Sequence, residues 1–253
     1  MNKSKKIKNY MRHVYSKDWH IKRIEYGLTD YDESIINLVK ETESNLLLEV
    51  GVGDGEPYAK HFFEQGFQIY GIDISDSLIN IAKNNLPNID FKVGDAENID
   101  FNDYFFDATY CFRSTWYFPN LLKAVNEMIR VTKKGGFVIF DLQNKNNIIH
   151  IKAIKRRKLK KNLFVLTIGL KFLKNVINII SNKNSYKNYD WSLNYVIYEN
   201  PTNISELLNS LNKIKRIKKI EIFGANSLDK TSIKSIHLDK INDFDRIILR
   251  IKL

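Results

Sequence analysis

A short apolar run that ends in a cluster of glycines constrains the fold of this chain more than any other feature. Leu46 to Val50 has the length and composition of a strand that is buried on both faces of a sheet. Gly51, Gly53 and Gly55 follow, and a helix is predicted over residues 56–65. Glycine at such a junction permits a tight turn and lets a ligand lie against the main chain, at the sheet edge where α/β proteins bind ligands. The sequence therefore predicts a parallel sheet with a ligand site at this turn.

Strand and helix patterns then alternate along the chain. Strands are predicted at 46–50, 68–73, 89–93, 105–112 and 137–142, and helices at 56–65, 77–86 and 119–132. Such alternation specifies parallel strands with right-handed crossovers and helices on both faces. A helix that starts at Asn203 and strands at 217–223 and 244–251 end the chain, after a strand-like segment at 192–198. We expect an α/β fold with a Rossmann-like, seven-stranded, mostly parallel sheet.

Two segments interrupt this pattern. Residues 1–44 read as helical and are expected to form a lid, and residues 145–191 read as a helical cap inserted into a core made of 45–144 and 192–253. Twelve of the 40 Lys and Arg residues lie between Leu142 and Tyr189, a stretch without Asp or Glu, in a chain of net charge +11. Such a basic segment can hold an anionic ligand, and residues 152–180 can also rest on an anionic membrane surface.

The composition indicates the cellular compartment and argues against a disulfide, a zinc site and a membrane span. Cys111 is the only cysteine, so an internal disulfide is impossible, and no Cys and His residues have the spacing of a zinc site. The basic N-terminus lacks the apolar stretch of a secretory signal. Residues 163–180 contain Lys171 and Lys174 and are too polar for a membrane span. We expect a cytoplasmic protein without a bound metal.

The charges around the glycine turn indicate which cofactor it suits. Dinucleotide-binding turns follow the pattern Gly-x-Gly-x-x-Gly, but here Glu56 stands at the third glycine position and Pro57 follows it. A pyrophosphate at a helix N-terminus needs N–H groups and no nearby anions. This turn also contains Glu49 and Asp54, so its charges oppose NAD. They suit S-adenosylmethionine, whose ammonium and sulfonium groups are positive.

Several motifs occur in the order found in one enzyme family. The string from Glu49 to Gly55 resembles motif I of the class I methyltransferases. Asp73 ends the second strand, twenty residues beyond Gly53, where the family's ribose-binding acid stands. Residues 94–97 resemble the adenine-contacting turn, and 105–108 and 127–137 resemble later signatures of the family. The resemblance implies a site for S-adenosylmethionine and its product S-adenosylhomocysteine formed by Glu49, Gly51, Gly53, Asp54, Gly55, Asp73, Ile74, Asp95, Ala96, Glu97 and Phe112.

The resemblance implies methyl transfer but does not identify a base. In-line methyl transfer requires mainly that the protein align acceptor and methyl group, and a base is needed only when the acceptor must lose a proton. The segment from Cys111 to Phe118 should lie beside the methyl group, and it lacks the histidine found there in many relatives. The candidate catalytic residues are therefore Arg113, as an anion clamp, with His20 and Asp141.

The acceptor is the least constrained part of the prediction. The chain lacks the Pro-Pro turn after the fourth strand that is typical of amino methyltransferases of nucleic-acid bases, so nucleic acid is disfavoured. We expect a small anionic or phosphorylated acceptor, for example a hydroxyl of a sugar or glycan precursor. The alternatives are a lipid or quinone-like acceptor at a membrane, and a nucleic-acid-binding protein that keeps S-adenosylmethionine as a structural ligand. The candidate substrate-binding residues are Arg113, Trp116, Asn144, Arg156, Arg157 and Trp191.

Overall fold

The computed structural model describes residues 3–14, 28–152, 155, 200–226 and 233–253. The chain divides into two compact units, one formed by Met1–Asn147 with Tyr198–Leu253 and the other by Ile148–Ile197. Most of the second unit lies outside the described residues, and so do residues 15–27 of the predicted lid. The predicted cap and the strand-like segment at 192–198 therefore remain predictions. No helix in the described ranges combines the length and hydropathy that a membrane span requires.

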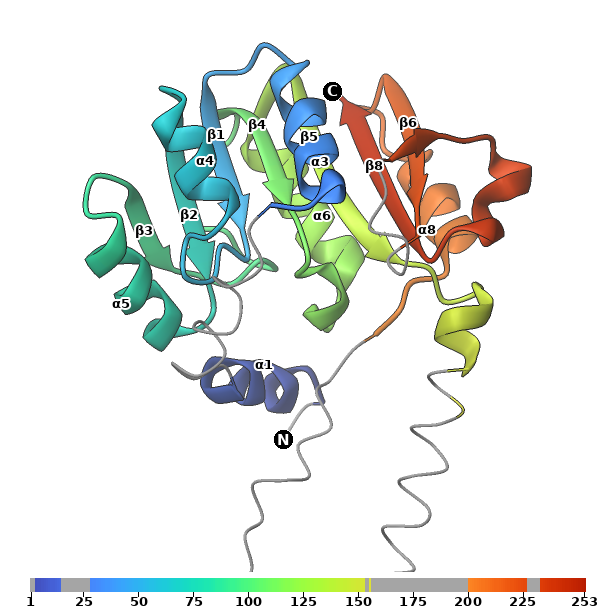
Figure 1. The fold of residues 1–253 in the computed structure, drawn as a ribbon, viewed down its shortest axis with the longest axis horizontal. Coiled ribbons are helices and arrows are strands. Elements are labelled where there is room, and N and C mark those ends of the chain that lie inside the picture. Colours follow the sequence, from blue (N-terminus) through green and yellow to red (C-terminus); the bar gives the residue numbers. More distant parts are fainter. Residues whose placement is uncertain (1–2, 15–27, 153–154, 156–199, 227–232) are drawn as a thin grey trace, which may run out of the picture. The chain divides into compact units, whose positions relative to one another are not determined.

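The first unit contains one eight-stranded sheet with the strand order β3-β2-β1-β4-β5-β8-β6-β7 (Figure 1). Neighbouring strands from β3 to β5 pair in parallel, whereas β8 pairs antiparallel with both β5 and β6. The predicted α/β architecture is thus confirmed, and seven of the strands are those predicted. The eighth, β7, has only two residues, too few for a sequence pattern to indicate. The strands are β1 (Leu46–Val50), β2 (Gln68–Asp73), β3 (Asp90–Val93), β4 (Phe106–Cys111), β5 (Thr132–Gln143), β6 (Lys219–Ala225), β7 (Lys234–Ser235) and β8 (Arg246–Lys252).

Helices cover both faces of this sheet (Figure 1). Buried side chains of α3, α4 and α5 form one apolar core with the sheet, and those of α6 and α8 form the other. The helices are α1 (Lys3–Val14), α3 (Asp30–Lys40), α4 (Tyr58–Glu64), α5 (Asp76–Asn85), α6 (Leu121–Val131) and α8 (Ile204–Leu211), with short 3₁₀ helices η1 (Thr115–Tyr117) and η3 (Leu238–Asp243).

The central position of β1 explains its apolar sequence. Leu47 and Leu48 are both fully buried, and they point to opposite faces of the sheet because side chains alternate along a strand. Leu47 joins the core beneath α3 and α4, and Leu48 joins the core beneath α6 and α8. A strand buried on both faces cannot tolerate the polar alternation of a surface strand. The glycine turn follows the carboxyl end of this strand, so packing of β1 between the two cores fixes the position of the turn.

Side-chain caps fix the ends of two helices that the sequence predicts. Thr29 and Asp32 form a reciprocal capping box at the start of α3, in which each side chain accepts a hydrogen bond from the other residue's backbone N–H. Asn203 caps α8 and accepts a hydrogen bond from the backbone N–H of Glu206, as the sequence predicts. The first of these caps matters for the site, because Asp32 also reaches Arg113.

Candidate cofactor site

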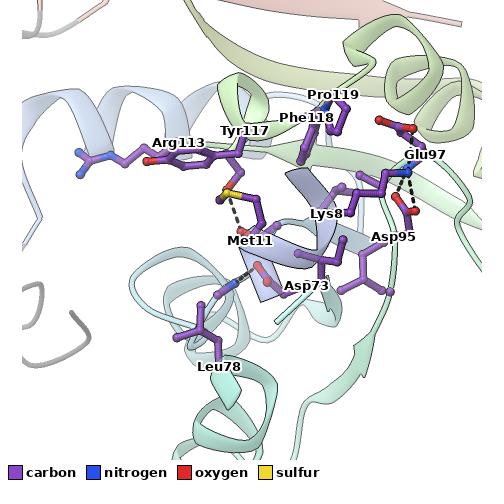
Figure 2. A pocket seen from close by; sticks show the side chains of 18 of the residues that line it. Lys8, Met11, Asp73, Leu78, Asp95, Glu97, Arg113, Tyr117, Phe118 and Pro119 are labelled. Carbon is purple, nitrogen blue, oxygen red and sulfur yellow. Dashed lines mark hydrogen bonds and ion pairs between the residues drawn. The ribbon is translucent and has the colours of Figure 1, made fainter. Parts of the chain in front are cut away.

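A cavity of about 360 Å³ lies at the carboxyl ends of β1, β2 and β4, beside α1 (Figure 2). Eight of the eleven predicted cofactor-binding residues line it: Gly51, Gly53, Asp73, Ile74, Asp95, Ala96, Glu97 and Phe112. Residues that the sequence did not single out for the cofactor complete the lining: Lys8, Met11, Val50, Ile72, Leu78, Gly94, Arg113, Ser114, Tyr117, Phe118 and Pro119. The position matches the sheet edge at which α/β proteins bind ligands.

The glycine turn after β1 uses its own N–H groups internally. The N–H groups of Gly51 and Val52 donate to the carbonyl of Ile72 at 2.8 and 3.0 Å, and that of Gly53 donates to Asp73 at 3.0 Å. Pro57, which precedes α4, has no N–H group to offer. A pyrophosphate is held mainly by free N–H groups at such a turn. The turn is therefore built for a ligand other than a dinucleotide.

Asp73 stands at the end of β2 with acceptor capacity to spare. One carboxylate oxygen accepts from the N–H of Ser75 at 2.8 Å, and the other accepts from the N–H of Gly53 at 3.0 Å. Each oxygen of a carboxylate has about two acceptor sites, so each can accept one further hydrogen bond from the cavity. Burial raises the pKa of Asp73 above its ordinary value, against the lowering effect of these N–H donors. Figure 2 shows Asp73 at the cavity wall below Met11.

A lysine from α1 occupies the acidic end of the cavity. The Lys8 ammonium lies 2.7 Å from a carboxylate oxygen of Asp95 and 2.8 Å from one of Glu97 (Figure 2). Burial lowers the pKa of Lys8, but these two hydrogen bonds raise it overall above its ordinary value. The two carboxylates therefore bind a cationic nitrogen in this structure, which is the kind of group that an acid-lined cavity favours.

Three predicted cofactor residues support the turn without lining the cavity. Glu49 is buried and accepts a hydrogen bond from the Tyr110 hydroxyl at 3.1 Å. Asp54 is fully buried and accepts from the backbone N–H of Glu56 at 3.1 Å. A Cβ atom on Gly55 would lie 2.8 Å from a side-chain carbon of Leu86, so this glycine permits close packing against α5. These three residues stabilise the turn from the side that faces away from the cavity.

Arg113 and Asp141 belong to one buried polar network. The backbone N–H of Arg113 donates to Asp141 at 2.7 Å, and its guanidinium donates to Asp32 at 2.6 Å. Asp141 is fully buried and also accepts from the Tyr31 hydroxyl at 2.9 Å. Arg113 lines the cavity, but Figure 2 shows its guanidinium pointing away from Lys8 and Met11. Its charge is already paired, and Asp141 holds the segment after β4 in place.

The other predicted catalytic and substrate-binding residues do not line the cavity or lie outside the described residues. Trp116 is buried, with the Arg246 guanidinium 4.1 Å from its ring. The Asn144 side chain is also buried and donates to the carbonyls of Ile241 and Phe244, which is a structural role. The residues outside the described ranges are His20, Arg156, Arg157 and Trp191.

Sequence comparison identifies the family. Residues 48–140, which include the glycine turn, Asp73 and Asp95, match the family described as methyltransferase domain. The chain belongs to the class I S-adenosylmethionine-dependent methyltransferases. S-adenosylmethionine is accordingly its cofactor, as the charges around the glycine turn indicate. No curated protein matches the sequence significantly.

Solved structures show the same fold over nearly the whole methyltransferase. A methyltransferase from Thermotoga maritima described as S-adenosylmethionine-dependent superposes with a TM-score of 0.63 at 16% identity, over 96% of this chain and 97% of that one. Another so described, from Methanosarcina mazei, has a TM-score of 0.55 at 18% identity, over 87% and 97%. A Pyrococcus horikoshii protein has a TM-score of 0.53 at 16% identity, over 100% and 99%. At these identities the likeness shows the fold alone.

The residues of this methyltransferase that sequence reasoning missed lie far apart along the chain. Lys8 meets Asp95 across 87 residues, and no local pattern could reveal that contact. The only hint is that α1 has no acidic residue in its first turn and several lysines. Tyr117 and Phe118 lie within the segment that the sequence places beside the methyl group but were not named as site residues, and Pro119 follows that segment directly. Among the residues described, no three His, Cys, Asp or Glu side chains gather into a metal site.

Proposed function

We propose that this methyltransferase transfers the methyl group of S-adenosylmethionine to a small anionic or phosphorylated acceptor. The observation that supports the cofactor part is the chemistry of the cavity wall. The N–H groups of Gly51, Val52 and Gly53 already donate within the protein, whereas the acidic residues Asp73, Asp95 and Glu97 line the cavity. Such a wall suits a cationic nucleoside without phosphate and disfavours a dinucleotide.

The residues around the cavity fit the parts of this cofactor. The spare acceptor sites of Asp73 would take the two ribose hydroxyls, and the carboxylate of Asp95, beside Ala96, would take the exocyclic amine of adenine. The apolar side chains of Ile74 and Leu78 would pack against the ring. The amino-acid portion would lie against the glycine turn, where a Cβ atom on Gly51 would meet the Cβ atom of Ser114 at 2.6 Å, so only glycine lets these two parts of the cavity wall pack together.

Methyl transfer requires the protein to align the acceptor with the methyl group and to exclude water. S-adenosylmethionine supplies a methyl carbon activated by its sulfonium group. The chain's task is to hold the acceptor atom in line with that carbon and to bury it. The segment from Phe112 to Pro119 lies along the cavity and is the part placed to orient the acceptor.

The acceptor part of the proposal is supported by charge. The Arg113 guanidinium is paired with Asp32, whereas the segment between Leu142 and Tyr189 carries twelve Lys and Arg residues and no acidic residue, and we expect this segment to attract an anionic acceptor. Replacing Arg156 and Arg157 by Ala should raise the acceptor KM and leave the affinity for S-adenosylhomocysteine unchanged. The exposed pair Lys213 and Lys215, replaced in the same way, is the control for the loss of two charges.

The direct experiment is a methyl-labelling screen. Purified protein and S-adenosylmethionine labelled in its methyl group are offered sugar phosphates, nucleotide-linked sugars and small carboxylic acids, with neutral sugars, RNA and anionic vesicles containing a quinone as separate arms. The proposal expects label only in the arms that contain small anionic molecules. Label in the RNA or vesicle arm would replace the proposed acceptor by a nucleic acid or by a membrane-bound molecule.

A further inference from the structure

Three buried polar atoms without a hydrogen-bond partner gather near the carboxyl end of β5. Within the described part of the chain, the buried side-chain atoms that lack a partner are Trp116 Nε1, Gln143 Oε1, Arg246 NH1 and, elsewhere, Arg216 Nε. An unpaired buried donor or acceptor costs about 1–3 kcal/mol, so native proteins rarely keep several together without a use. Trp116 and Gln143 are 4% and 6% exposed.

The three side chains are neighbours in space. Gln143 and Arg246 stand directly opposite each other in the antiparallel pair β5–β8, which places both side chains on the same face of the sheet. The Arg246 guanidinium lies 4.1 Å from the centre of the Trp116 ring. Arg246 therefore lies between Trp116 and Gln143, and the three side chains that carry the unpaired atoms form one cluster.

The Asp141 carboxylate does not complete this cluster. Its nearest oxygen is 3.7 Å from Arg246 NH1, which is an ion pair beyond hydrogen-bond distance. That oxygen accepts from the Tyr31 hydroxyl, and the other accepts from the backbone N–H of Arg113. Asp141 thus balances part of the Arg246 charge but leaves the N–H of NH1 unsatisfied.

The cluster adjoins the cofactor cavity. Trp116 lies in the 3₁₀ helix η1 together with Tyr117, and Arg113, Ser114, Tyr117 and Phe118 on either side of it line the cavity. A molecule bound to Trp116 would thus stand beside the segment that the proposed function assigns to acceptor alignment.

We propose that Trp116, Gln143 and Arg246 form the polar end of the acceptor site and bind a carboxylate with a neighbouring hydroxyl or amino group. The carboxylate oxygens accept from the indole and guanidinium N–H groups, and the neighbouring group donates to the Gln143 carboxamide oxygen. This arrangement satisfies all three orphaned atoms at once. The inference rests on the proposed function and specifies the acceptor as a hydroxy acid or amino acid derivative.

The test uses glycolate, the smallest molecule with the required pair of groups, and ethylene glycol as its uncharged counterpart. Each compound is added to about 100 mM, since molecules this small bind weakly, and the protein is ¹⁵N-labelled and loaded with S-adenosylhomocysteine. The binding is followed by NMR spectroscopy. The three tryptophans give three indole N–H signals, and the signal absent from Trp116→Phe belongs to Trp116. We expect glycolate to shift that signal saturably and ethylene glycol to leave it in place.

Two variants show whether the unpaired atoms form a binding site or are buried polar atoms without a function. Gln143→Met should weaken glycolate binding by about tenfold, the loss expected for one buried hydrogen bond, and should raise the melting temperature by removing an unpaired acceptor. Arg250→Gln changes an arginine on the same strand that is paired with Glu221 and Glu41, and should leave glycolate binding unchanged.

The outcomes distinguish the two levels of the proposal. An unmoved Trp116 signal in protein that has bound S-adenosylhomocysteine overturns the acceptor subsite, and so does a shift that Gln143→Met leaves intact. Failure to bind S-adenosylhomocysteine at all would instead reject the proposed function on which the subsite depends.

Discussion

Replacing Asp73 by Asn tests the ribose-binding role through the hydrogen bonds that the structure assigns to this side chain. The carboxylate already accepts from the N–H groups of Gly53 and Ser75, one at each oxygen. An asparagine has a single acceptor oxygen, so its amide group must face one of these two N–H donors. The variant therefore loses a backbone contact of the turn as well as the charge that would hold the ribose hydroxyls.

The expected loss follows from the number of charged hydrogen bonds. Each hydrogen bond to a charged group contributes about 1.5–3 kcal/mol, and asparagine can retain at most one of the two to the ribose. Allowing about 2–4 kcal/mol in all, Asp73→Asn should weaken binding of S-adenosylhomocysteine by about 30- to 1,000-fold. Isothermal titration calorimetry on the variant and on wild type measures this ratio directly.

The matched control is Asp76→Asn, which removes the same charge three residues away from an exposed position in the first turn of α5. It should change the affinity by less than about threefold, because exposed charges are well screened. If Asp73→Asn bound the cofactor product as tightly as Asp76→Asn while remaining folded, the assignment of Asp73 to the ribose would be refuted.

Further predictions address the turn, the N-terminal helix, protonation and the polar network. Gly51→Ala should lower the melting temperature and S-adenosylhomocysteine affinity far more than Gly135→Ala, because both glycines have positive φ but only the first would meet Ser114. Lys8→Met should accelerate S-adenosylhomocysteine association in stopped-flow measurements, since Asp95 and Glu97 would no longer be occupied; an unchanged rate would contradict this. Affinity for S-adenosylhomocysteine should fall as the pH is lowered through the raised pKa of Asp73, because only the ionised carboxylate accepts both hydroxyls; in calorimetry, Asp73→Asn should lose this dependence. Arg113→Gln should lower the free energy of unfolding by about 1–3 kcal/mol in urea titrations, because it leaves the buried Asp32 without its cation, and should leave S-adenosylhomocysteine affinity nearly unchanged.

The sequence predicted the parts of the fold that local patterns determine. The apolar run at Leu46–Val50 identified the central strand because both of its faces are buried. The end of β2 placed Asp73 at the cavity because parallel strands present their carboxyl ends at one edge of the sheet. The sequence also predicted S-adenosylmethionine in place of NAD, although the carboxylates that line the cavity are those of Asp73, Asp95 and Glu97 and not the acids of the turn itself.

The sequence could not predict the features of the site that depend on contacts between residues far apart in the chain. Glu49 and Asp54 belong to the cofactor motif, yet they face the protein interior, and sequence spacing cannot show which way a side chain points. Arg113 looked like an anion clamp until the structure paired it with Asp32, a residue 81 positions earlier in the chain. Trp116 was proposed for substrate binding, but the unsatisfied atoms that connect it with Gln143 and Arg246 become visible only when β5 and β8 are paired.

The most direct test of the account is the choice of ligand by the wild-type protein. Isothermal titration calorimetry compares S-adenosylmethionine and S-adenosylhomocysteine with NAD under identical conditions. The account predicts heat of binding with one site for the first two and no binding of the dinucleotide, because the N–H groups of Gly51, Val52 and Gly53 are already hydrogen-bonded within the protein and are not available to a pyrophosphate. Tight binding of NAD with no heat from either S-adenosyl compound would contradict the central claim.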